Sequence, residues 1–459
     1  MKSRGFRGGL TLPLDESPAL LLPILDLTQS LPPNPHQSDR HRSNTDAVIN
    51  HDGQHDTDPP KSLGDPINGT RSPSADRAGI EHLCGLGGAG FSLARKIASG
   101  QHSNIDTLII NAAECEPMMA CDQALIRESA TAIVHGIEDL LHHTGVMRAM
   151  IGIESHRTTE ISLLRHALAH RRGITLHTIE PRYPTGSESL LIRVLTGRQV
   201  PADGLPRDCG VLCFNIATAH AFGVWMREGL SQTSRIVTVA GNAIDTPRNV
   251  RVAFGVPITQ VITSVEPTID SANLKQYEVT VGGPMTGRAM HGIDETITAK
   301  TNCLIIDQPA EALPARRCIR CGQCNDVCPV NLLPQQLHWY ARDSQIMLDD
   351  LQRFHLDQCI ECGCCDVVCP SQIPLTAQFR VAKVALDDSR EREARADLAA
   401  QRYTARELRL KRREQEKAAR IAARKTELAK TRKPGSDRHT AIQDAIKRAK
   451  ASRAKGGPG

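Results

Sequence analysis

The feature that most constrains this chain is a cysteine motif that occurs twice. The spacing C-x2-C-x2-C-x3-C, followed by Pro, appears at Cys318, Cys321, Cys324 and Cys328, and again at Cys359, Cys362, Cys365 and Cys369. Three cysteines at three-residue intervals let a tight loop wrap one face of an iron–sulfur cube, and the proline after the fourth cysteine redirects the chain. The two motifs therefore predict two [4Fe–4S] clusters on eight cysteines.

The fourth cysteine of each motif is expected to bind the cluster of the other motif, as in two-cluster ferredoxins. One cluster would be held by Cys318, Cys321, Cys324 and Cys369, and the second by Cys359, Cys362, Cys365 and Cys328. This exchange requires neighbouring clusters, which suits electron relay in a ferredoxin-like domain. Structural zinc is the alternative, but it favours separated cysteine pairs over triplets. Cys364 lies between two ligands and is interpreted as a bystander.

The positions of the cysteines and the lengths of the apolar runs indicate the cellular compartment of the chain. Most of the 15 cysteines lie in the two motifs, and the apolar run after Arg7 breaks at Pro13 and Asp15, so no export signal is predicted. A reducing cytoplasm is therefore expected. No segment reaches the ~18 consecutive apolar residues of a membrane-spanning helix. Membrane contact is predicted to be peripheral, through partners or the tail.

Charge is distributed unevenly along the 459 residues. The net charge of +5 conceals a basic tail, because residues 390–459 hold 22 Lys and Arg against 9 Asp and Glu; this local charge of +13 leaves −8 for the first 389 residues. The tail composition predicts a helix up to about Lys433. Two interpretations stay open: a solvated helix of mixed charge, or a helix lying on an anionic membrane or acidic partner loops. Nucleic acid is not predicted as a partner, because few aromatic residues interleave with the basic ones.

Apolar periodicity predicts the remaining elements. An aromatic content of only 3% implies a core built mainly from aliphatic side chains. Alternating strands and helices indicate an α/β domain with a largely parallel sheet. The predicted strands are 107–111, 149–153 and 211–216, and the predicted helices are 123–142 and a segment ending near His170. From Arg235 to Val281 the pattern is mainly β, with apolar runs at 236–241, 255–258 and 277–281.

These patterns divide the chain into six parts. They are an N-terminal segment (1–31), a disordered polar linker (32–79), an α/β nucleotide-binding domain (80–232), a small β-rich module (233–300), an α+β ferredoxin-like domain with two clusters (301–380) and a basic helical or disordered tail (381–459). The linker is rich in Pro, Asn, Asp, His, Ser and Gly, and such a stretch buries too little apolar surface to offset its ordering entropy.

A glycine-rich loop and an acidic motif lie in the α/β domain. The loop contains Gly87, Gly88 and Gly90 and opens a helix that carries Lys96, so its free N–H groups face a potential phosphate. A glycine run alone is more often a tight turn. Asn111, Glu114 and Glu116 follow the buried strand 107–111, at the edge where α/β sheets bind ligands. Their side chains can accept hydrogen bonds from ribose or ribityl hydroxyls.

The loop Gly85-Leu86-Gly87-Gly88-Ala89-Gly90-Phe91 resembles the flavin-binding loop of the NADH-oxidising flavoprotein subunit of respiratory complex I. The segment Asn111-Ala112-Ala113-Glu114-Cys115-Glu116-Pro117 is similar to the C subunit of Rnf-type ion-translocating oxidoreductase complexes. Further similar segments follow in the same order: Tyr183-Pro184-x-Gly186-x-Glu188, Thr196-Gly197-Arg198-x-Val200-Pro201, Asn215-Ile216-Ala217-Thr218, Gly282-Gly283-Pro284-Met285-x-Gly287 and Thr301-Asn302-Cys303. The likeness covers residues 80–378 and implies that the β-rich module is SLBB-like.

The resemblance implies a peripheral subunit on the cytoplasmic side of the inner membrane. NADH and FMN would exchange electrons in the α/β domain, and two clusters would relay them to partner subunits that couple redox to ion transport. The chain would thus be part of a translocase and oxidoreductase. Residue by residue, Gly87, Gly88, Gly90 and Lys96 would meet the FMN phosphate, Asn111, Glu114 and Glu116 would line the flavin and nicotinamide, and Asn215 and Thr218 would close the far side.

The sequence departs from the family pattern at two places. Phe6 to Leu10 is similar to the family's opening motif, but the polar stretch 32–79 stands where a small β domain usually follows. Ser92-Leu93 replaces the usual Pro-Thr after the glycine loop, although Ser92 can still cap the helix. Two alternatives therefore stay open: an iron–sulfur carrier or scaffold subunit without a working flavin site, and a soluble NADH dehydrogenase module.

Overall fold

A computed structural model of the chain describes residues 24–28, 77–101, 103–202, 204–309, 314–342, 346–431 and 438–454. The predicted linker lies outside the described residues as far as residue 76, and so does the motif from Phe6 to Leu10. The chain divides into two compact units, Met1–Lys383 and Val384–Gly459, which are treated separately below. Short 3-10 helices are formed by Arg77–His82, Pro206–Cys209, Leu274–Gln276 and Leu356–Gln358.

A four-stranded parallel sheet forms the centre of the α/β domain. Its strands are β2 (Thr107–Asn111), β3 (Ala149–Glu154), β4 (Ile174–Ile179) and β5 (Val211–Asn215), in the order β4-β3-β2-β5. All neighbouring pairs are parallel, which confirms the predicted strands and the predicted sheet type. The sequence analysis did not identify β4. Because all strands point the same way, the residues that follow β2, β3 and β5 gather at one edge.

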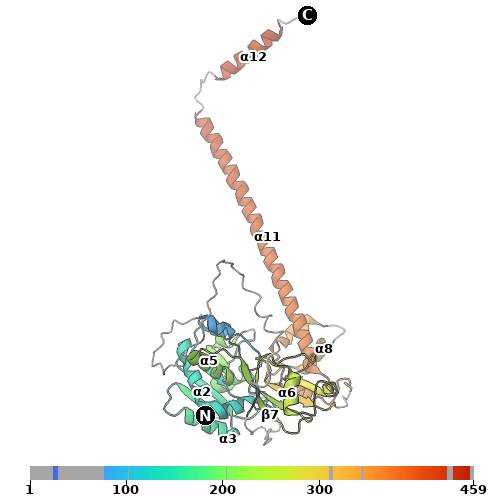
Figure 1. Cartoon of the computed structure of the whole chain (residues 1–459). Helices are drawn as coiled ribbons and strands as arrows, with labels where there is room; N and C mark the ends of the chain where they lie inside the picture. The colour runs from blue at the N-terminus through green and yellow to red at the C-terminus, as the bar shows by residue number, and fades with distance from the viewer. Residues whose placement is uncertain are drawn as a thin grey trace. The chain divides into compact units, whose positions relative to one another are not determined.

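Helices cover both faces of this sheet (Figure 1). They are α1 (Leu93–Gln101), α2 (Cys121–Thr144), α3 (Thr158–Ala167), α4 (Glu188–Thr196) and α5 (Ile216–Glu228). Leu108 and Ile110 pack with α2 and α5, whereas Ile109 packs with α4 on the other face, as the two-residue period of a strand requires. Helices α2 and α5 approach so closely that a Cβ at Gly136 would lie 2.0 Å from the carbonyl oxygen of Ala219.

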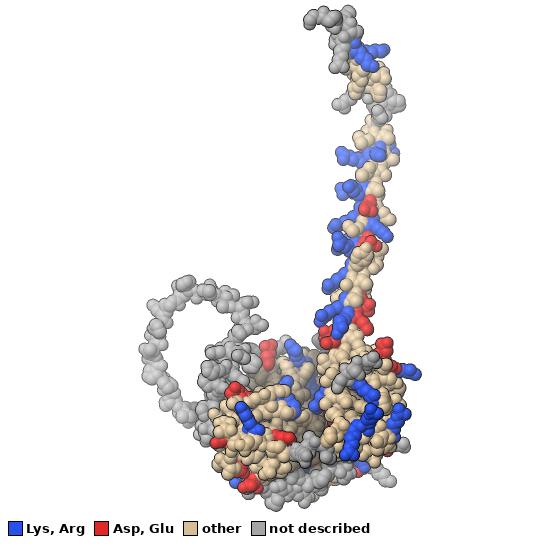
Figure 2. Space-filling model, turned by 90° about the vertical axis from the view of Figure 1, so that its right-hand side faces the viewer, with Lys and Arg blue, Asp and Glu red and all other residues tan. Residues whose placement is uncertain are grey.

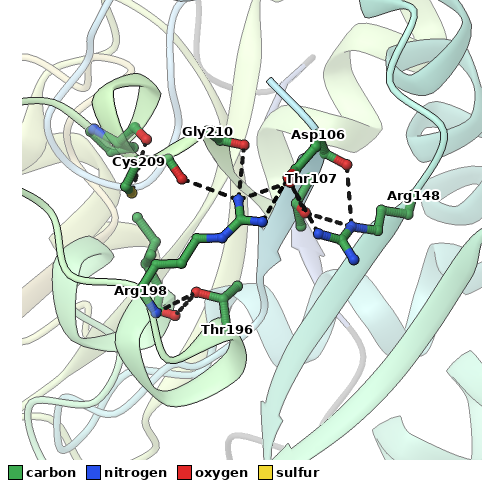
Figure 3. Close-up of polar contacts among 9 residues, drawn as sticks. Asp106, Thr107, Arg148, Thr196, Arg198, Cys209 and Gly210 are labelled. Carbon is green, nitrogen blue, oxygen red and sulfur yellow. Dashed lines mark hydrogen bonds and ion pairs between the residues drawn. The ribbon is translucent and has the colours of Figure 1, made fainter. Parts of the chain in front are cut away.

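The amino edge of the sheet is locked by charged side chains (Figure 3). Arg198 donates to the Asp106 carboxylate at 2.8 and 2.7 Å and also reaches the carbonyl oxygens of Cys209 and Gly210. Arg148 donates to Asp106 at 3.1 Å and to Thr107 at 2.6 Å. The network ties together the segments that lead into β2, β3 and β5.

A six-stranded mixed sheet follows. It contains β1 (Leu25–Asp26), β6 (Ser234–Ala240), β7 (Arg248–Ala253), β8 (Glu278–Val281), β9 (Arg288–Ala289) and β10 (Cys303–Asp307), in the order β1-β7-β6-β10-β8-β9. Strand β10 lies between β6 and β8, so this sheet continues past residue 300, where the sequence placed a domain boundary. The apolar run at 255–258 leads into a helix, α6 (Ile258–Val265), because Pro257 stands at its N-cap.

The cysteine motifs form two copies of one short unit. The helices are α7 (Gln323–Asp326), α8 (Pro334–Tyr340), α9 (Leu348–Arg353), α10 (Cys364–Val367) and the start of α11 (Leu375–Thr431). Gly322 and Gly363 both have φ near +80°, at 83° and 75°, at equivalent positions of the two copies. Asn325 and Asp366 each accept a hydrogen bond from the start of the following helix. The sequence repeat is therefore also a structural repeat.

The second unit is helical. Helix α11 continues to Thr431, and α12 spans Arg438–Ala454. Every residue of α11 from Glu391 onward is exposed, and Lys and Arg outnumber Asp and Glu along it (Figure 2). A helical tail is therefore confirmed up to the end of α11. In the part of the chain that the structure describes, no helix is both long enough and apolar enough to cross a membrane.

Candidate functional site

A cleft of about 750 Å³ opens at the carboxyl edge of the parallel sheet. It is lined by segments from all parts of the first unit: the glycine loop, the turn after β2, the segment 183–187, the loop between β8 and β9, and the second cysteine motif. Open α/β sheets bind ligands at this edge. Of the predicted flavin residues, the cleft is lined by Gly87, Gly88, Asn111, Glu114, Glu116 and Asn215.

Glu114 caps helix α2 from the preceding turn. Its carboxylate accepts hydrogen bonds from the backbone N–H groups of Asp122 at 3.1 Å and Gln123 at 3.2 Å, and from the Cys121 thiol at 3.2 Å. These hydrogen bonds satisfy backbone donors of the first turn of α2. Burial, together with the Glu114 charge, raises the pKa of the neighbouring Asp122. Two acidic side chains, Glu114 and Asp122, therefore line the cleft next to each other.

The two asparagines fix the sides of the cleft. Asn111 donates to the carbonyl oxygen of Gly186 at 2.8 Å and accepts from the N–H of Ala113 at 3.0 Å. Asn215 caps α5 by accepting from Ala217 at 2.9 Å, and its amide donates to Asp122 at 2.6 Å. Asn111 is the last residue of β2 and Asn215 the last residue of β5. Their hydrogen bonds therefore connect the ends of these strands to the starts of α2 and α5 and to the loop at Gly186.

Glu116 joins the turn after β2 to the loop between β8 and β9. Its carboxylate accepts from the N–H of Met285 at 3.2 Å and from the hydroxyl of Thr286. Burial raises the pKa of Glu116, although these donors act in the opposite direction. A Cβ at Gly283 would overlap this carboxylate, so the glycine is needed for the two loops to meet.

The glycine loop gives the cleft a wall of bare backbone. A Cβ at Gly87 would lie 3.1 Å from the side chain of Asn215, and Gly88 has φ of +96°, a conformation that other residues rarely adopt. Ser92 caps the following helix through the N–H of Arg95, as predicted. Backbone N–H groups and a surface without side chains allow a planar ring and a phosphate to approach closely. The geometry of this wall thus fits the FMN that the sequence predicts.

Three predicted flavin residues do not line the cleft. Lys96 pairs with Glu188 at 2.6 Å, and Gly90 lies against the side chain of Lys300. Thr218 accepts from the N–H of Leu86 at 2.9 Å and thereby positions the glycine loop from behind. The positive charges in the cleft come from residues that the sequence analysis did not select, namely Arg235, Arg288, Lys300 and Arg380. They come from remote segments, so no local motif marks them.

The eight motif cysteines gather around two separate pockets. One is lined by Cys318, Cys321, Cys324 and Cys369. The other is lined by Cys359, Cys362, Cys365 and Cys328. Each pocket therefore combines three cysteines of one motif with the fourth of the other, the arrangement that a two-cluster ferredoxin uses. Four thiols around each pocket match the donor set of a [4Fe–4S] cube. Cys364 also borders the second pocket but is itself buried.

The second cysteine motif also borders the flavin-type cleft. Ile360 and Cys362 line the cleft, and Cys362 lines the cluster pocket as well. The Tyr183 hydroxyl donates to the carbonyl oxygen of Cys362 at 2.7 Å. Arg380 and Lys383 both pair with Glu361 in the same loop, at 3.0 and 2.6 Å. A residue of one cluster pocket thus forms part of the cleft wall.

Comparisons with known proteins agree with this architecture. Residues 79–223 match a family described as the Nuo51 FMN-binding domain, and residues 314–373 match a 4Fe-4S dicluster domain. The C subunit of the ion-translocating oxidoreductase complex of Salmonella typhimurium is 40% identical over 377 residues, which is 81% of this chain and 49% of that protein. The resemblance to the C subunit of Rnf complexes is confirmed. This chain is a relative of those proteins.

A second relative and a solved structure were also found to be similar to the chain. The corresponding C subunit of Pseudomonas aeruginosa is 41% identical over 340 residues, which covers 73% of this chain and 43% of that protein. The chain thus spans about half the length of the curated relatives it matches. A solved structure of an NAD+-reducing [NiFe]-hydrogenase in the H2-reduced state is 20% identical, with a TM-score of 0.41 over 50% of this chain and 45% of that chain. That likeness is too low to carry a conclusion.

Proposed function

We propose that this chain is an electron-transfer subunit that passes electrons between NADH, FMN and two [4Fe–4S] clusters. The observation that carries the proposal is the shared wall between cleft and cluster pocket. Ile360 and Cys362 line the cleft, and Cys362 is also a predicted cluster ligand. A flavin in the cleft and the cluster of the second motif would therefore be neighbours, as electron transfer requires.

The residues of the cleft have distinct roles in this proposal. Gly87 and Gly88 offer backbone N–H groups, and Arg235, Lys300 and Arg380 offer positive charge to the phosphates of FMN and NADH. Asn111, Glu114, Glu116 and Asn215 line the ring and nicotinamide side. Thr218 holds the glycine loop through the N–H of Leu86. Gly90 lies in the loop against Lys300, and Lys96 pairs with Glu188. When bound, FMN supplies the conversion between two-electron hydride chemistry and one-electron steps.

The two cluster pockets differ in their position along the proposed route. The pocket of Cys359, Cys362, Cys365 and Cys328 borders the cleft, whereas no cysteine of the other pocket lines it. The pocket of Cys318, Cys321, Cys324 and Cys369 includes the exposed Cys321. We therefore place the cluster of the second motif next to the flavin and that of the first motif at the surface, facing a partner subunit.

The wider role follows from the relatives. We propose that the chain is a peripheral subunit on the cytoplasmic side of the inner membrane, within an Rnf-type complex that couples electron transfer to ion transport. Its relatives are subunits of ion-translocating oxidoreductase complexes, which supports this proposal. In this proposal the six-stranded sheet is the SLBB-like module, and its extent is 233–307 rather than 233–300, because β10 completes it. The basic tail would lie near acidic partners or anionic lipid.

Cofactor content tests the proposal directly. The full chain is purified without oxygen, and iron, acid-labile sulfide and noncovalent flavin are assayed together with reduced-state paramagnetic resonance. About eight irons and one FMN per chain are expected, with reduction of the clusters by NADH. Iron without flavin would favour the carrier or scaffold alternative. Flavin and NADH oxidation in a chain that associates with no membrane subunits would favour the soluble dehydrogenase module, and zinc in place of iron would overturn the proposal.

Cysteine pairs test the exchanged ligands. The double variant Cys318→Ser/Cys369→Ser alters a single pocket and is expected to keep about four irons. The double variant Cys318→Ser/Cys328→Ser alters both pockets and is expected to lose both clusters, although both cysteines come from the same motif. The reverse result would show that each motif holds its own cluster. Cys364→Ala serves as the matched control and is expected to retain full iron.

A further inference from the structure

Glu154 is a buried carboxyl group that the proposed function leaves without a role. It is the last residue of β3, at the carboxyl edge of the parallel sheet, and its residue exposure is 1%. Neither carboxylate oxygen makes a hydrogen bond of ordinary geometry within the described ranges. Burying an unpaired carboxylate is strongly unfavourable, so such a group normally takes up a proton instead. An orphaned carboxyl beside a ligand cleft therefore needs a physical explanation.

The charges around Glu154 are mostly negative. Asn111 of β2 pairs with Gly152 of β3, so the register brings Glu154 beside the turn that carries Glu114 and Cys115. The charges of Glu114 and Asp122 both couple to this group, Asp122 from the start of α2. This set, Glu114, Asp122 and Glu154, is called the carboxyl cluster below. Two of its members, Glu114 and Asp122, line the cleft.

Positive charge near the cluster comes from Arg157 and from Arg235, which lines the cleft and acts on Asp122. Arg157, which precedes α3, is the cation that acts on Glu154, but its guanidinium donates to the Gln123 side chain at 2.7 Å. Arg127 on α2 is engaged by Glu160 of α3 at 2.5 Å. Arg157 Nε has no hydrogen-bond partner among the described residues, so this arginine offsets part of the Glu154 charge from nearby. A proton is the other cation that can neutralise Glu154.

The titration behaviour agrees with this geometry. Burial raises the pKa of Glu154 to about 7, and the Glu114 charge acts in the same direction. Arg157 and the backbone N–H groups of Glu154 and Glu114 oppose the shift. A group with this pKa is partly protonated at neutral pH, so a change of charge in the adjacent cleft alters its proton occupancy.

We propose that Glu154 holds a proton in the carboxyl cluster, and that the binding of an anionic ligand in the cleft is coupled to proton uptake at Glu154. This inference rests on the proposed function in one respect, namely that the anionic ligands are FMN and NADH. Added negative charge favours the neutral form of Glu154, so each anion bound draws a fraction of a proton from solution. No bond between heavy atoms forms or breaks in this step.

Calorimetry measures the coupling. FMN is titrated into flavin-free full chain near neutral pH in buffers of different ionisation enthalpy, and the slope gives the protons taken up. An uptake of up to about half a proton per FMN is expected for a group whose pKa is close to the working pH. Glu154→Gln, which mimics the protonated form, should lose the Glu154 share of this uptake, while the share of Asp122, whose pKa is raised too, remains. Glu160→Gln, an equally buried but ion-paired glutamate on α3, should keep it.

A measurement without flavin separates this inference from the proposed function. Infrared difference spectra between about pH 5 and about pH 9 should contain a protonated-carboxyl band that Glu160→Gln keeps and Glu154→Gln diminishes. If FMN does not bind, the flavin proposal fails, and the band alone tests the proton site. A band that Glu154→Gln diminishes then still supports a proton on Glu154. Equal bands in both variants, or equal proton uptake in both, would overturn the assignment to Glu154.

Discussion

The acidic side chains at the two edges of the parallel sheet have pKa values that are shifted in opposite directions. At the amino edge, Asp106 accepts hydrogen bonds from Arg198, Thr107 and Arg148 (Figure 3), and the Arg198 hydrogen bond is the largest of the effects that lower the pKa of Asp106 far below its usual range. At the carboxyl edge, burial raises the pKa of both Asp122 and Glu154. The same strands thus begin beside a paired carboxylate and end beside a cluster of buried carboxyl groups with raised pKa values.

This difference separates stability from function within one sheet. At the amino edge, Asp106 is paired with both Arg148 and Arg198, and these arginines also donate to Thr107 and to the carbonyl oxygens of the segment before β5. The carboxyl edge keeps bare glycine backbone, cations from remote loops and carboxyl groups that oppose ionisation. Buried carboxyl groups of this kind destabilise the fold unless a bound ligand or a proton neutralises their charge. The contrast therefore marks the carboxyl edge as the binding edge without reference to any relative.

The largest effect expected from this difference between the two edges is on the pH dependence of the free energy of unfolding. Glu154 has a folded pKa of about 7 against an ordinary 4.5, so the folded state binds its proton more tightly than the unfolded state. Stability should therefore be highest below about pH 4.5 as far as this group is concerned, and fall as pH rises towards about 7, by up to about 3 kcal/mol. Denaturant unfolding of flavin-free protein across this range measures the loss.

Glu154→Gln should remove the Glu154 share of this loss and make the protein more stable than the wild type above neutral pH. The Asp122 share should remain, because its pKa is raised too. Stability that falls equally in the variant and the wild type would show that Glu154 does not ionise in this window.

A pair of glycines compares the cleft with a site remote from it. Gly88 at the cleft and Gly145 after α2 both have positive φ, +96° and +72°, and a Cβ at Gly145 would meet nothing within 4 Å. Gly88→Ala and Gly145→Ala should each cost roughly 1–2 kcal/mol of stability through backbone strain. Only Gly88→Ala should also weaken FMN binding, by about tenfold, equivalent to about 1.4 kcal/mol. Flavin titration of both variants measures this, and equal affinities would place the flavin away from the glycine loop.

The smallest expected effect lies at the amino edge. Asp106→Asn should cost about 1 kcal/mol at neutral pH, because the Asp106 side chain is 53% exposed and its ion pairs are partly screened. A lowered folded pKa stabilises the protein above the unfolded value of 3.8, and this stabilisation is lost as pH falls below it. The difference between variant and wild type should thus shrink in acid and in high salt. Asp139→Asn, which removes a pair with a single arginine, should change stability less.

Much of the architecture was accessible from the sequence because it depends on local order. The strands at 107–111 and 211–215 are buried apolar runs, the second predicted one residue longer, and the glycine loop with Ser92 indicates the start of α1. Strand β4 was missed because its burial is broken by polar residues in the middle. The apolar run at 255–258 predicts β structure, whereas in the fold Pro257 is the N-cap of helix α6.

The sequence by itself determined the two cysteine motifs, the prediction that they exchange fourth ligands and the candidate carboxylates after β2, because motif spacing and strand ends are properties of neighbouring residues. Tertiary structure alone decided which of these residues meet. It paired Lys96 with Glu188, brought Arg380 from the start of α11 to the cleft and buried the carboxylate oxygens of Glu154 with no hydrogen bond of ordinary geometry in the described residues. Burial and Coulomb interactions depend on distance in space, and segments that are far apart in the sequence set them.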